Sequence, residues 1–592
     1  MTLTRRQFGR LAVVPAVATA AATTTATTAR AATAPTRAEV LAAMRRAAAF
    51  LDEHVSYRGA YVWNYLPDLS RSWGEMEANR TMCWVQPPGT PSVGHAMLDA
   101  YHATGDEVFL RAAERTGLAL VAAQLPVGGW NYVHDFAGTA SLRRWYRTVG
   151  ANGWRLEEFQ HHYGNATFDD AGTASAAQLV LRLYLERRDP RFRASLERAI
   201  RFVLKAQFRG GVADGGWPQR FPRFSGSVAQ TPWPDQRPSW LPDDVAHGME
   251  DGEYTQHVTF NDDVLGENVK FLLMCMSTLD RDELAGPVRR AMSCLRRLQQ
   301  PAPQAGWGLQ HLSTAAGGRP AGAPAGARSY EPRALATHTT QTNVRQLFHY
   351  FRLTGDRAFL TRVPEAIAWL DSCPLTDQQV AENPLLAGRT HPTFVELGTN
   401  RARFVHRFGS NVRNGAYYFD HDHRRTLSHY SAGRAVDTAS LRATYDELMS
   451  LSDEQVADLR ARSPLSGGAI PLPRFFSLRD LELTDLFRDA PLPLPAVTDA
   501  EAGGLVADLG DKDHWLTPVD AVTNPYRGAP PATPYDGQAY MSKHVGDLHD
   551  TSPYDPRTPP EEPPYQPQER PLVISTSAFV ANMGKLVAWT AR

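Results

Sequence analysis

Glycines, tryptophans and carboxylates that together suit a sugar-binding site lie between residues 215 and 262. The stretch opens with Gly215-Gly216-Trp217-Pro218-Gln219 and closes with Thr259-Phe260-Asn261-Asp262. Glycines allow close approach of the backbone, aromatic rings offer apolar faces, and aspartates bind cations. Long ordered loops in compact domains are usually functional, although a plain surface loop could have the same composition. The stretch therefore predicts a sugar-binding cleft with a cation site.

One class of chemistry fits acidic loops of this kind. A uronic-acid polymer is cut without water when a base removes the C5 proton and the C4 oxygen leaves. A cation or arginines must neutralise the carboxylate beside C5, because its negative charge opposes loss of that proton. Aspartate and glutamate side chains on loops supply the oxygen ligands that calcium needs. These residue types are consistent with calcium-assisted β-elimination.

Five motifs, taken in order, resemble those of the family 10 polysaccharide lyases, the pectic acid lyases. They are Thr167-Phe168-Asp169-Asp170-Ala171-Gly172-Thr173, Gly215-Gly216-Trp217-Pro218-Gln219, His257-Val258-Thr259-Phe260-Asn261-Asp262, Ala327-Arg328-Ser329-Tyr330-Glu331 and Gly398-Thr399-Asn400-Arg401. The resemblance covers residues 165–410. It implies an incomplete α/α toroid that cleaves pectate, or another uronic-acid polymer, with the help of calcium.

The resemblance also implies roles for single residues. Asp169 and Asp262 match the family's aspartates of the calcium and uronate site. Arg328 matches the arginine that binds a substrate carboxylate, and Arg407 lies at the position of the catalytic base. Three neighbours in these motifs are further substrate-binding candidates: Tyr330, Trp217 and Gln219.

The expected base is unusual, and one arginine of the family is missing near it. An arginine base needs a dry, cationic surrounding, because a guanidinium is normally protonated. His406, next to Arg407, is the alternative base, since the usual pKa of histidine is near neutral. A further family arginine is replaced by Thr393, and three arginines are possible substitutes for its charge: Arg401, Arg403 and Arg413.

Two other functions compete with the lyase. An inverting glycoside hydrolase on the same toroid would need two carboxylates about 6.5–9.5 Å apart. Its candidates are Asp170, Asp263 and Glu331. A carbohydrate-binding protein with a decayed lyase site is the third hypothesis, and Thr393 is part of its support.

A repeated helical hairpin must position these residues. Gly-Trp pairs follow amphipathic helices at Gly129-Trp130, Gly216-Trp217 and Gly306-Trp307. The turn Thr104-Gly105-Asp106 recurs as Thr354-Gly355-Asp356, in which glycine ends one helix and aspartate caps the next. We therefore expect a mainly α fold, an incomplete (α/α) toroid of four hairpins within residues 40–372.

The rest of the chain divides by composition. We expect a signal peptide at 1–31, the toroid at 32–375, and short strands with one more helix (441–459) at 376–460. A proline-rich extended strap at 461–592 ends in an apolar segment, Val573 to Trp589. The first segment carries Arg5-Arg6 and ends in Ala29-Arg30-Ala31, which is typical of twin-arginine export.

Composition limits the partners. The net charge of -1 over 592 residues gives no support for nucleic acid or an anionic membrane as a partner, and no apolar run after the signal is long enough to span a bilayer. We expect a secreted monomer that binds an acidic polysaccharide. The four cysteines have no metal-ligand spacing. Cys275 and Cys294 are expected either to pair or to stay as buried thiols.

Overall fold

Four helical hairpins follow one another along the chain and form the body of the protein. The computed structural model describes residues 34–147, 165–223, 246–247, 250–328, 330–408, 416–424, 426, 433–518 and 572–592. The hairpins are α2–α3 (Thr90–Thr104, Glu107–Ala123), α5–α6 (Gly172–Arg187, Pro190–Ala206), α7–α8 (Val264–Leu279, Ala285–Arg297) and α9–α10 (Thr337–Thr354, Val363–Asp371). The predicted number of hairpins is confirmed.

The turns inside the hairpins use the chemistry predicted from the sequence. Gly105 and Gly355 end α2 and α9 in the left-handed conformation, with φ of 72° and 71°. Asp106 and Asp356 then accept a hydrogen bond from the backbone N–H two residues later. In the second and third hairpins the left-handed residue is not glycine but Arg188 or Asp280. The turn is therefore kept although its sequence has diverged.

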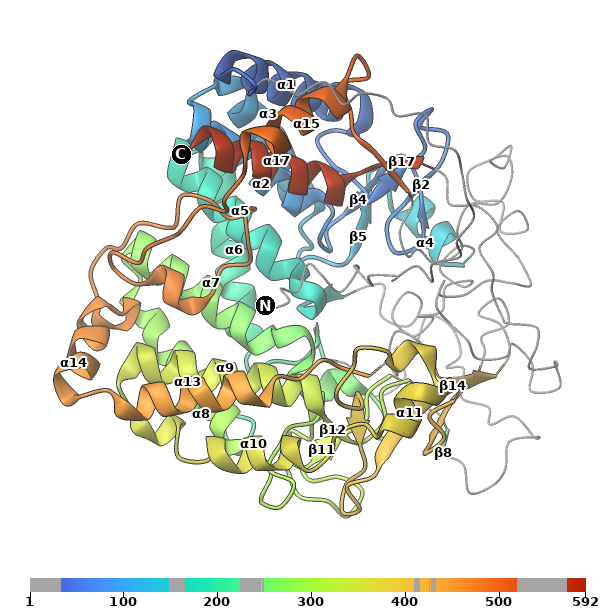
Figure 1. Cartoon of the computed structure of the whole chain (residues 1–592), viewed down its shortest axis with the longest axis vertical. Coiled ribbons are helices and arrows are strands. Elements are labelled where there is room, and N and C mark those ends of the chain that lie inside the picture. The colour runs from blue at the N-terminus through green and yellow to red at the C-terminus, as the bar shows by residue number, and fades with distance from the viewer. Residues whose placement is uncertain are drawn as a thin grey trace.

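The hairpins pack side by side in a curve. Helix α2 contacts α5, α5 contacts α7, and α8 contacts α9. Figure 1 shows this succession running from the blue helices near the N-terminus to the yellow helices α8, α9 and α10. The fold is an α/α toroid, as the repeats predict.

The Gly-Trp pairs fasten each hairpin to the next. Trp130, Trp217 and Trp307 are fully buried. Their indole N–H groups donate to the carbonyls of Leu120, Val203 and Leu295, at 2.8, 2.8 and 2.9 Å. The preceding glycines have no room for a side chain: a Cβ on Gly216 would lie 2.6 Å from a methyl group of Val258. Glycine is required here for close packing.

Short strands link the hairpins on the side where the chain leaves each Gly-Trp pair. They pair antiparallel as β4–β5 (Met82–Trp84, Val133–Asp135), β6–β7 (Ala166–Thr167, Arg220–Phe221), β9–β10–β11 (Val258–Thr259, Gln310–His311, Pro324–Ala325) and β12–β13 (Leu335–Ala336, Phe394–Val395). Each ladder joins the segment before a hairpin to the segment after the same hairpin. Successive units are tied by backbone bonds, in which the N–H groups of Thr167, Thr259 and Ala336 donate to the carbonyls of Trp130, Trp217 and Trp307.

The last hairpin leads into the largest sheet, whose order is β12-β13-β14-β15-β8. It adds β14 (Ala402–Phe408), β15 (Ala416–Asp420) and β8 (Ala246–His247). The strands expected after residue 394 are therefore present, while the proposed turn at 414–415 lies outside the described residues. Strand β8 comes from the stretch between residues 215 and 262 and extends the sheet that carries Arg407.

The segment 441–459 is two helices rather than one. Helix α13 (Thr438–Ser450) ends before Ser452, which caps α14 (Asp453–Arg462) by accepting a hydrogen bond from the N–H of Gln455. A serine followed three residues later by glutamine forms a capping box, which starts a new helix. Three further helices are α1 (Arg37–Phe50), α4 (Thr139–Arg147) and α11 (Asp377–Glu382).

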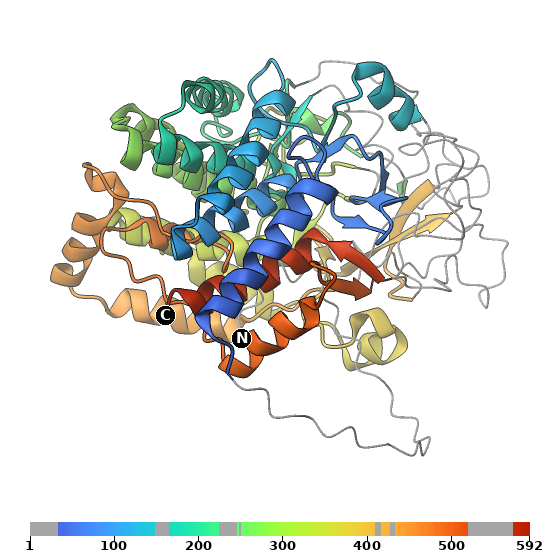
Figure 2. The same ribbon diagram turned by 90° about the horizontal axis from the view of Figure 1, so that it is seen from above.

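The C-terminal part packs against the beginning of the chain. Strand β17 (Leu572–Ser575) joins a sheet of order β16-β17-β1-β2-β3, which also contains β16 (Leu516–Pro518), β1 (Asn64–Tyr65), β2 (Ser72–Trp73) and β3 (Glu77–Ala78). The terminal apolar segment is helix α17 (Thr576–Thr590), which packs on α2. Figure 2 shows α17 beside α1 and the orange helix α15 (Asp499–Leu509). The segment predicted as an extended strap thus contains helices where its apolar residues have helical spacing.

All four cysteines are buried and free. Cys275 and Cys294 were expected either to form a disulfide or to stay as buried thiols, and in the structure they are buried thiols. None of the helices among the described residues is long and apolar enough to cross a membrane.

Candidate functional site

Three carboxylates meet where two neighbouring hairpins begin. Asp169 and Asp170 lie in the turn before α5, and Asp262 lies in the corresponding turn before α7. One oxygen from each of the three side chains lies within 4.8 Å of the others. The structure therefore brings together Asp169 and Asp262, as predicted, and adds Asp170.

The two turns have the same construction. The hydroxyl oxygens of Thr167 and Thr259 accept the N–H groups of Asp169 and Asn261, at 3.1 and 3.2 Å. Two consecutive residues then take the left-handed conformation. They are Asp170 and Ala171 in the first turn (φ 50° and 55°) and Asp262 and Asp263 in the second (φ 46° and 54°).

Four residues without glycine's freedom hold this conformation. Each costs about 1–2 kcal/mol relative to the ordinary helical region. Such strain persists only where the surroundings impose it, and it is concentrated at functional sites. The turns also place the carboxylates at the first turns of α5 and α7, where the positive end of the helix dipole favours negative charge. Local strain and electrostatics both mark these turns as a candidate site.

Asp169 is the buried member of the group, with 1% of its surface exposed. The Tyr132 hydroxyl donates to its Oδ2, and the Asn261 amide donates to its Oδ1 at 3.1 Å. Arg328 Nη1 lies 3.3 Å from Oδ2. Since Asn261 comes from the second turn, this hydrogen bond joins the two turns directly.

Asp170 and Asp262 are the members that reach solvent, Asp170 in part and Asp262 more fully. The side-chain amide of Gln86 donates to Asp170 Oδ2 at 2.7 Å, and the Tyr132 hydroxyl lies 3.3 Å from the same oxygen. The carboxylate group therefore has a buried side, at Asp169, and an accessible side, at Asp170 and Asp262.

Arg328 lies beside the group, but its guanidinium is 1% exposed. It donates to both carboxylate oxygens of Glu331, at 2.9 Å from Nε and 2.7 Å from Nη2, and it also contacts Asp169. A buried guanidinium between two carboxylates has both its charge and its donors engaged. Arg328 is thus next to the predicted site, with its guanidinium facing Glu331 and Asp169.

The other three substrate-binding candidates are buried as well. Trp217 and Gln219 are 0% exposed; the indole of Trp217 is bonded to Val203, and Gln219 Oε1 accepts from Gln310 at 2.8 Å. Tyr330 is also 0% exposed and packs with Leu309. A side chain without exposed surface offers no face to a sugar. We therefore assign these three to the packing beneath the site, which corrects the prediction.

The predicted base, Arg407, lies on β14 opposite Tyr417 of β15. Its side chain is outside the described residues. The neighbouring His406 is buried, stacks on Tyr418 with ring centres 4.9 Å apart, and has its Nε2 3.0 Å from Asp420 Oδ1. A carboxylate in this position orients an imidazole. His406 is therefore held in place by Asp420 and Tyr418.

Thr393, which replaces a family arginine, is buried beside β13. Of the three arginines considered as substitutes, Arg403 lies opposite Phe394, the residue after Thr393, on the paired strand. Arg403 Nη2 is 3.6 Å from Glu396 and Nη1 is 3.9 Å from Glu250. Arg401 is exposed, and Arg413 lies outside the described residues. Arg403 is the substitute that the strand pairing brings nearest.

Sequence reasoning missed Tyr132, Gln86 and Asn261 as partners of the carboxylates. Tyr132 stands two residues after the Gly129-Trp130 pair, the place that Gln219 has in the next unit. Alignment of the repeats on their Gly-Trp pairs would have pointed to it. Likewise, alignment of Thr167-Phe168-Asp169-Asp170 with Thr259-Phe260-Asn261-Asp262 pairs Asp170 with Asp262 and Asn261 with Asp169. Gln86 has no such local signal.

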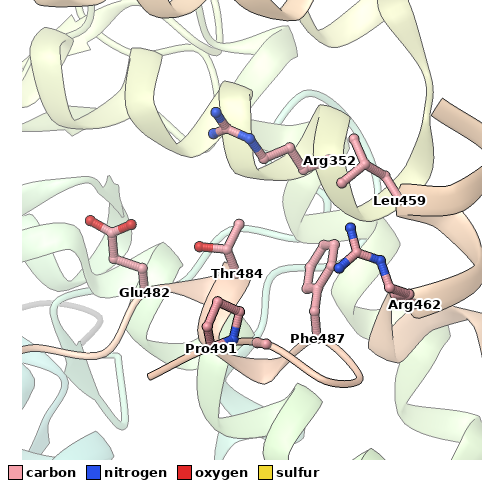
Figure 3. Close-up of a pocket in the computed structure, with 8 residues that line it drawn as sticks. Arg352, Leu459, Arg462, Glu482, Thr484, Phe487 and Pro491 are labelled. Atoms are coloured by element: carbon pink, nitrogen blue, oxygen red, sulfur yellow. The ribbon is translucent and has the colours of Figure 1, made fainter. Parts of the chain in front are cut away.

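A separate pocket lies away from this group. Its lining residues are Arg352, Leu459, Arg462, Glu482, Thr484, Phe487, Ala490 and Pro491. Figure 3 shows that the lining comes from α9, from the end of α14 and from the segment that follows it. The lining includes none of the carboxylates or arginines of the candidate site, so we do not connect this pocket with them.

The fold and the carboxylate group define an α/α-toroid domain with an acidic site at the starts of α5 and α7. Residues 135–423 match the model of the pectic acid lyase family. This match lies on the region that carries the five motifs and confirms the resemblance to the pectic acid lyases.

The solved structures that align with this chain are distant in sequence. A family 10 polysaccharide lyase from Cellvibrio cellulosa aligns with 17% identity and a TM-score of 0.37, over 60% of this chain and 98% of that one. The unsaturated glucuronyl hydrolase of Bacillus sp. GL1 aligns with 12% identity and a TM-score of 0.30, over 57% and 67%. The alpha-1,6-mannanase of Salegentibacter sp. HEL1_6 has 11% identity and a TM-score of 0.30, over 58% and 72%. A comparison with curated proteins finds no match.

Proposed function

We propose that this chain is an exported polysaccharide lyase that cleaves a uronic-acid polymer, with polygalacturonate favoured, by calcium-assisted β-elimination. The observation that carries the proposal is the convergence of Asp169, Asp170 and Asp262 beside Arg328, within the region that matches the pectic acid lyases. A mutant of the family 10 polysaccharide lyase from Cellvibrio cellulosa has been solved with trigalacturonic acid bound, which supports this choice of polymer.

The carboxylate group fits a calcium ion. Oxygens bound to one calcium lie about 2.3–2.6 Å from it and therefore at most about 5 Å from one another. The three oxygens here, all within 4.8 Å of each other, meet that condition. Asp170 and Asp262 would hold the ion from the accessible side, and Asp169 from below. A bound calcium would neutralise the uronate carboxylate and so ease removal of the neighbouring proton.

The reaction needs one base and one acid. The base takes the C5 proton, the C5–H electron pair becomes the C4–C5 double bond, and the C4–O bond breaks. The released oxygen takes up a proton. In our proposal Arg407 is the base, and Arg328 adds positive charge beside the uronate carboxylate. Because Arg328 is buried and contacts Asp169, its charge would act from within the protein and not through direct contact with the sugar.

His406 is the alternative base. Its pairing with Asp420, at 3.0 Å, supports a role as an oriented imidazole. The two candidates predict different pH profiles, because activity that depends on a histidine base falls as that histidine becomes protonated, whereas an arginine base requires high pH.

The hydrolase is not favoured. It would use Asp170, Asp263 or Glu331 as acid or base. Both oxygens of Glu331 accept hydrogen bonds from Arg328, and Asp263 accepts one from Gln346 at 2.8 Å. Glu331 is also 2% exposed, so it is poorly placed to act as an acid or base on a bound sugar.

The test is the ultraviolet absorbance of the product. Full-length mature protein is incubated with polygalacturonate, with calcium or with a chelator, over a range of pH. We expect absorbance from the C4–C5 double bond, lost with the chelator, and a drop of about 10²–10⁴-fold in Arg407→Ala if Arg407 is the base. If activity instead drops in His406→Gln and not in Arg407→Ala, His406 is the base. Reducing ends without absorbance would replace the lyase by a hydrolase, and binding without turnover would indicate a decayed site.

A further inference from the structure

One tryptophan is placed differently from the others. Most tryptophans among the described residues are less than 2% exposed: Trp73, Trp84, Trp130, Trp145, Trp217, Trp307 and Trp369. Trp63 and Trp589 are partly exposed. Trp589 is at the end of α17, where its indole N–H donates to Asp499 at 2.8 Å. Trp63 instead lies beside residues that lead to the carboxylate group.

Gln86 is the link between Trp63 and the carboxylates. The Trp63 indole N–H donates to the carbonyl oxygen of Gln86 at 3.0 Å. The side-chain amide of the same glutamine donates to Asp170 Oδ2 at 2.7 Å. Trp84 Nε1 donates to Gln86 Oε1 at 3.0 Å, and this bond decides which end of the amide faces Asp170. Gln86 therefore contacts both residues, Trp63 through its backbone carbonyl and Asp170 through its side-chain amide.

Trp63 is rigidly held. Its ring meets the Trp84 ring edge to face, with centres 5.9 Å apart and planes at 61°. Its carbonyl oxygen accepts both the N–H and the hydroxyl of Thr576, at 2.9 and 3.1 Å. The next residue, Asn64, pairs with Ser575 of β17. A ring fixed in this way loses little conformational entropy when it binds a ligand.

We propose that Trp63 forms a sugar subsite next to the carboxylate group and packs its partly exposed side chain on the apolar face of a uronic-acid unit. The inference rests on the proposed function, since it takes the substrate from it. An indole suits this task because it presents a flat apolar face while its N–H is already bonded within the protein. A unit on Trp63 would neighbour the unit whose carboxylate lies at Asp170 and Asp262.

This subsite is built by parts of the chain outside the matched region. Residues 63, 84 and 86 precede residues 135–423, and residues 575 and 576 follow them. The two flanks meet at β1 and β17 and together fix the position of Trp63. In this proposal the flanks determine how the polymer extends from the cleavage point, whereas the matched region supplies the carboxylates.

The experiment compares three variants of the full mature protein: Trp63→Ala, Trp63→Phe and, as a control, Trp589→Ala. Binding of tri- and hexagalacturonate is measured by calorimetry with calcium present, and kcat and KM are measured on polygalacturonate. We expect Trp63→Ala to weaken binding of the hexamer about tenfold and to raise KM with little change in kcat, because a lost contact with a remote unit is uniform binding. Trp63→Phe should recover most of the affinity.

The control, Trp589→Ala, removes the other partly exposed tryptophan, whose indole is bonded to Asp499 and not to Gln86. Its affinity for hexagalacturonate should match that of the parent. Thermal unfolding of each variant distinguishes a lost contact from a lost fold. Hexamer affinity unchanged in a folded Trp63→Ala overturns the inference. If that variant does not fold, an unchanged affinity in Trp63→Leu overturns it. If the parent binds hexagalacturonate but makes no unsaturated product, the proposed lyase fails while the subsite is still decided by these affinities.

Discussion

At the scale of residues, the three aspartates of the site have different surroundings. Asp169 is buried and accepts hydrogen bonds from Tyr132, Asn261 and Arg328. Asp170 and Asp262 reach solvent. A carboxylate surrounded by donors has fewer lone pairs left for a cation than one that faces solvent. We therefore expect Asp169 to organise the group, and Asp170 and Asp262 to contribute most of the calcium affinity.

The first prediction concerns Asp170, which sequence reasoning did not include among the metal ligands. Asp170→Asn removes one negative charge and keeps the size of the side chain, so calcium affinity should fall about 10–100-fold, as expected for loss of a ligand or its close support. Calorimetric titration with calcium, without substrate, measures it.

Asp263→Asn is the matched control for that experiment. Asp263 is the next acidic residue after Asp262, has the same left-handed backbone, and is bonded to Gln346. Its substitution should leave calcium affinity within about twofold of the parent. Equal losses in both variants would mean that net charge near the turns, and not ligation by Asp170, governs the affinity.

At the scale of elements, the site depends on how closely successive hairpins approach. The glycine before each anchoring tryptophan sets this approach, because its Cα faces a side chain of the next unit. For Gly216 the neighbours of an added Cβ would be the two methyl groups of Val258, at 2.6 and 3.0 Å, and Cys294 Sγ at 3.2 Å. Val258 lies in β9, just before the Thr259–Asp262 turn. A displacement here would therefore move Asp262.

The second prediction follows from this packing. Gly216→Ala should lower the free energy of unfolding by about 1–3 kcal/mol, the usual cost of forcing an extra methyl group into a packed core. Denaturant titration measures it. Gly504→Ala in α15 is the control, because an added Cβ there meets no atom within 4 Å. That change should be neutral or stabilising by up to about 1 kcal/mol. Similar losses in both variants would contradict the proposed close contact.

At the scale of the whole molecule, buried histidines make stability depend on pH. Burial lowers the pKa of His311 to about 4, and it lowers the pKa of His257 to about 4. His311 Nε2 accepts the N–H of Gly308 at 3.1 Å, and its Nδ1 lies 2.8 Å from the carbonyl oxygen of Gly322. The ring must be neutral to accept at one nitrogen and donate at the other. A proton on Nε2 would break the first of these bonds.

The third prediction is the direction of the pH effect. The ordinary pKa of histidine is 6.5. Above this pH His311 and His257 are neutral in both the folded and the unfolded protein, so their burial costs no stability. Between 6.5 and about 4 the unfolded chain takes up protons that the folded chain does not. Stability should therefore fall with decreasing pH, by about 1.4 kcal/mol per pH unit for each such histidine.

Urea titrations at pH 7 and pH 5 test this. His311→Gln should be less stable than the parent at pH 7 but lose less stability on acidification. His54→Gln, at an exposed position, should keep the parent's pH dependence. An unchanged slope in His311→Gln would show that other groups carry the effect.

Much of the architecture could be predicted from the sequence because its signals are local. The Gly105-Asp106 and Gly355-Asp356 turns, the Gly-Trp pairs and the apolar spacing of the helices all act within a few residues of themselves. The turns that hold Asp169 and Asp262 are local too, since Thr167 and Thr259 each bond two residues ahead. That Asp169 and Asp262 share one site was expected from the family resemblance and not from these local signals.

Only the tertiary structure decided which neighbours these residues have. Burial of Trp217, Gln219 and Tyr330 depends on the units that pack over them, and the approach of Gln86 to Asp170 joins residues 84 positions apart. The split of the helix at Ser452 is a local signal that was overlooked, whereas the docking of α17 on α2 joins the two ends of the chain. Spacing along the sequence determines a side chain's element and face. Its burial and its partners depend on long-range packing, which no single segment encodes.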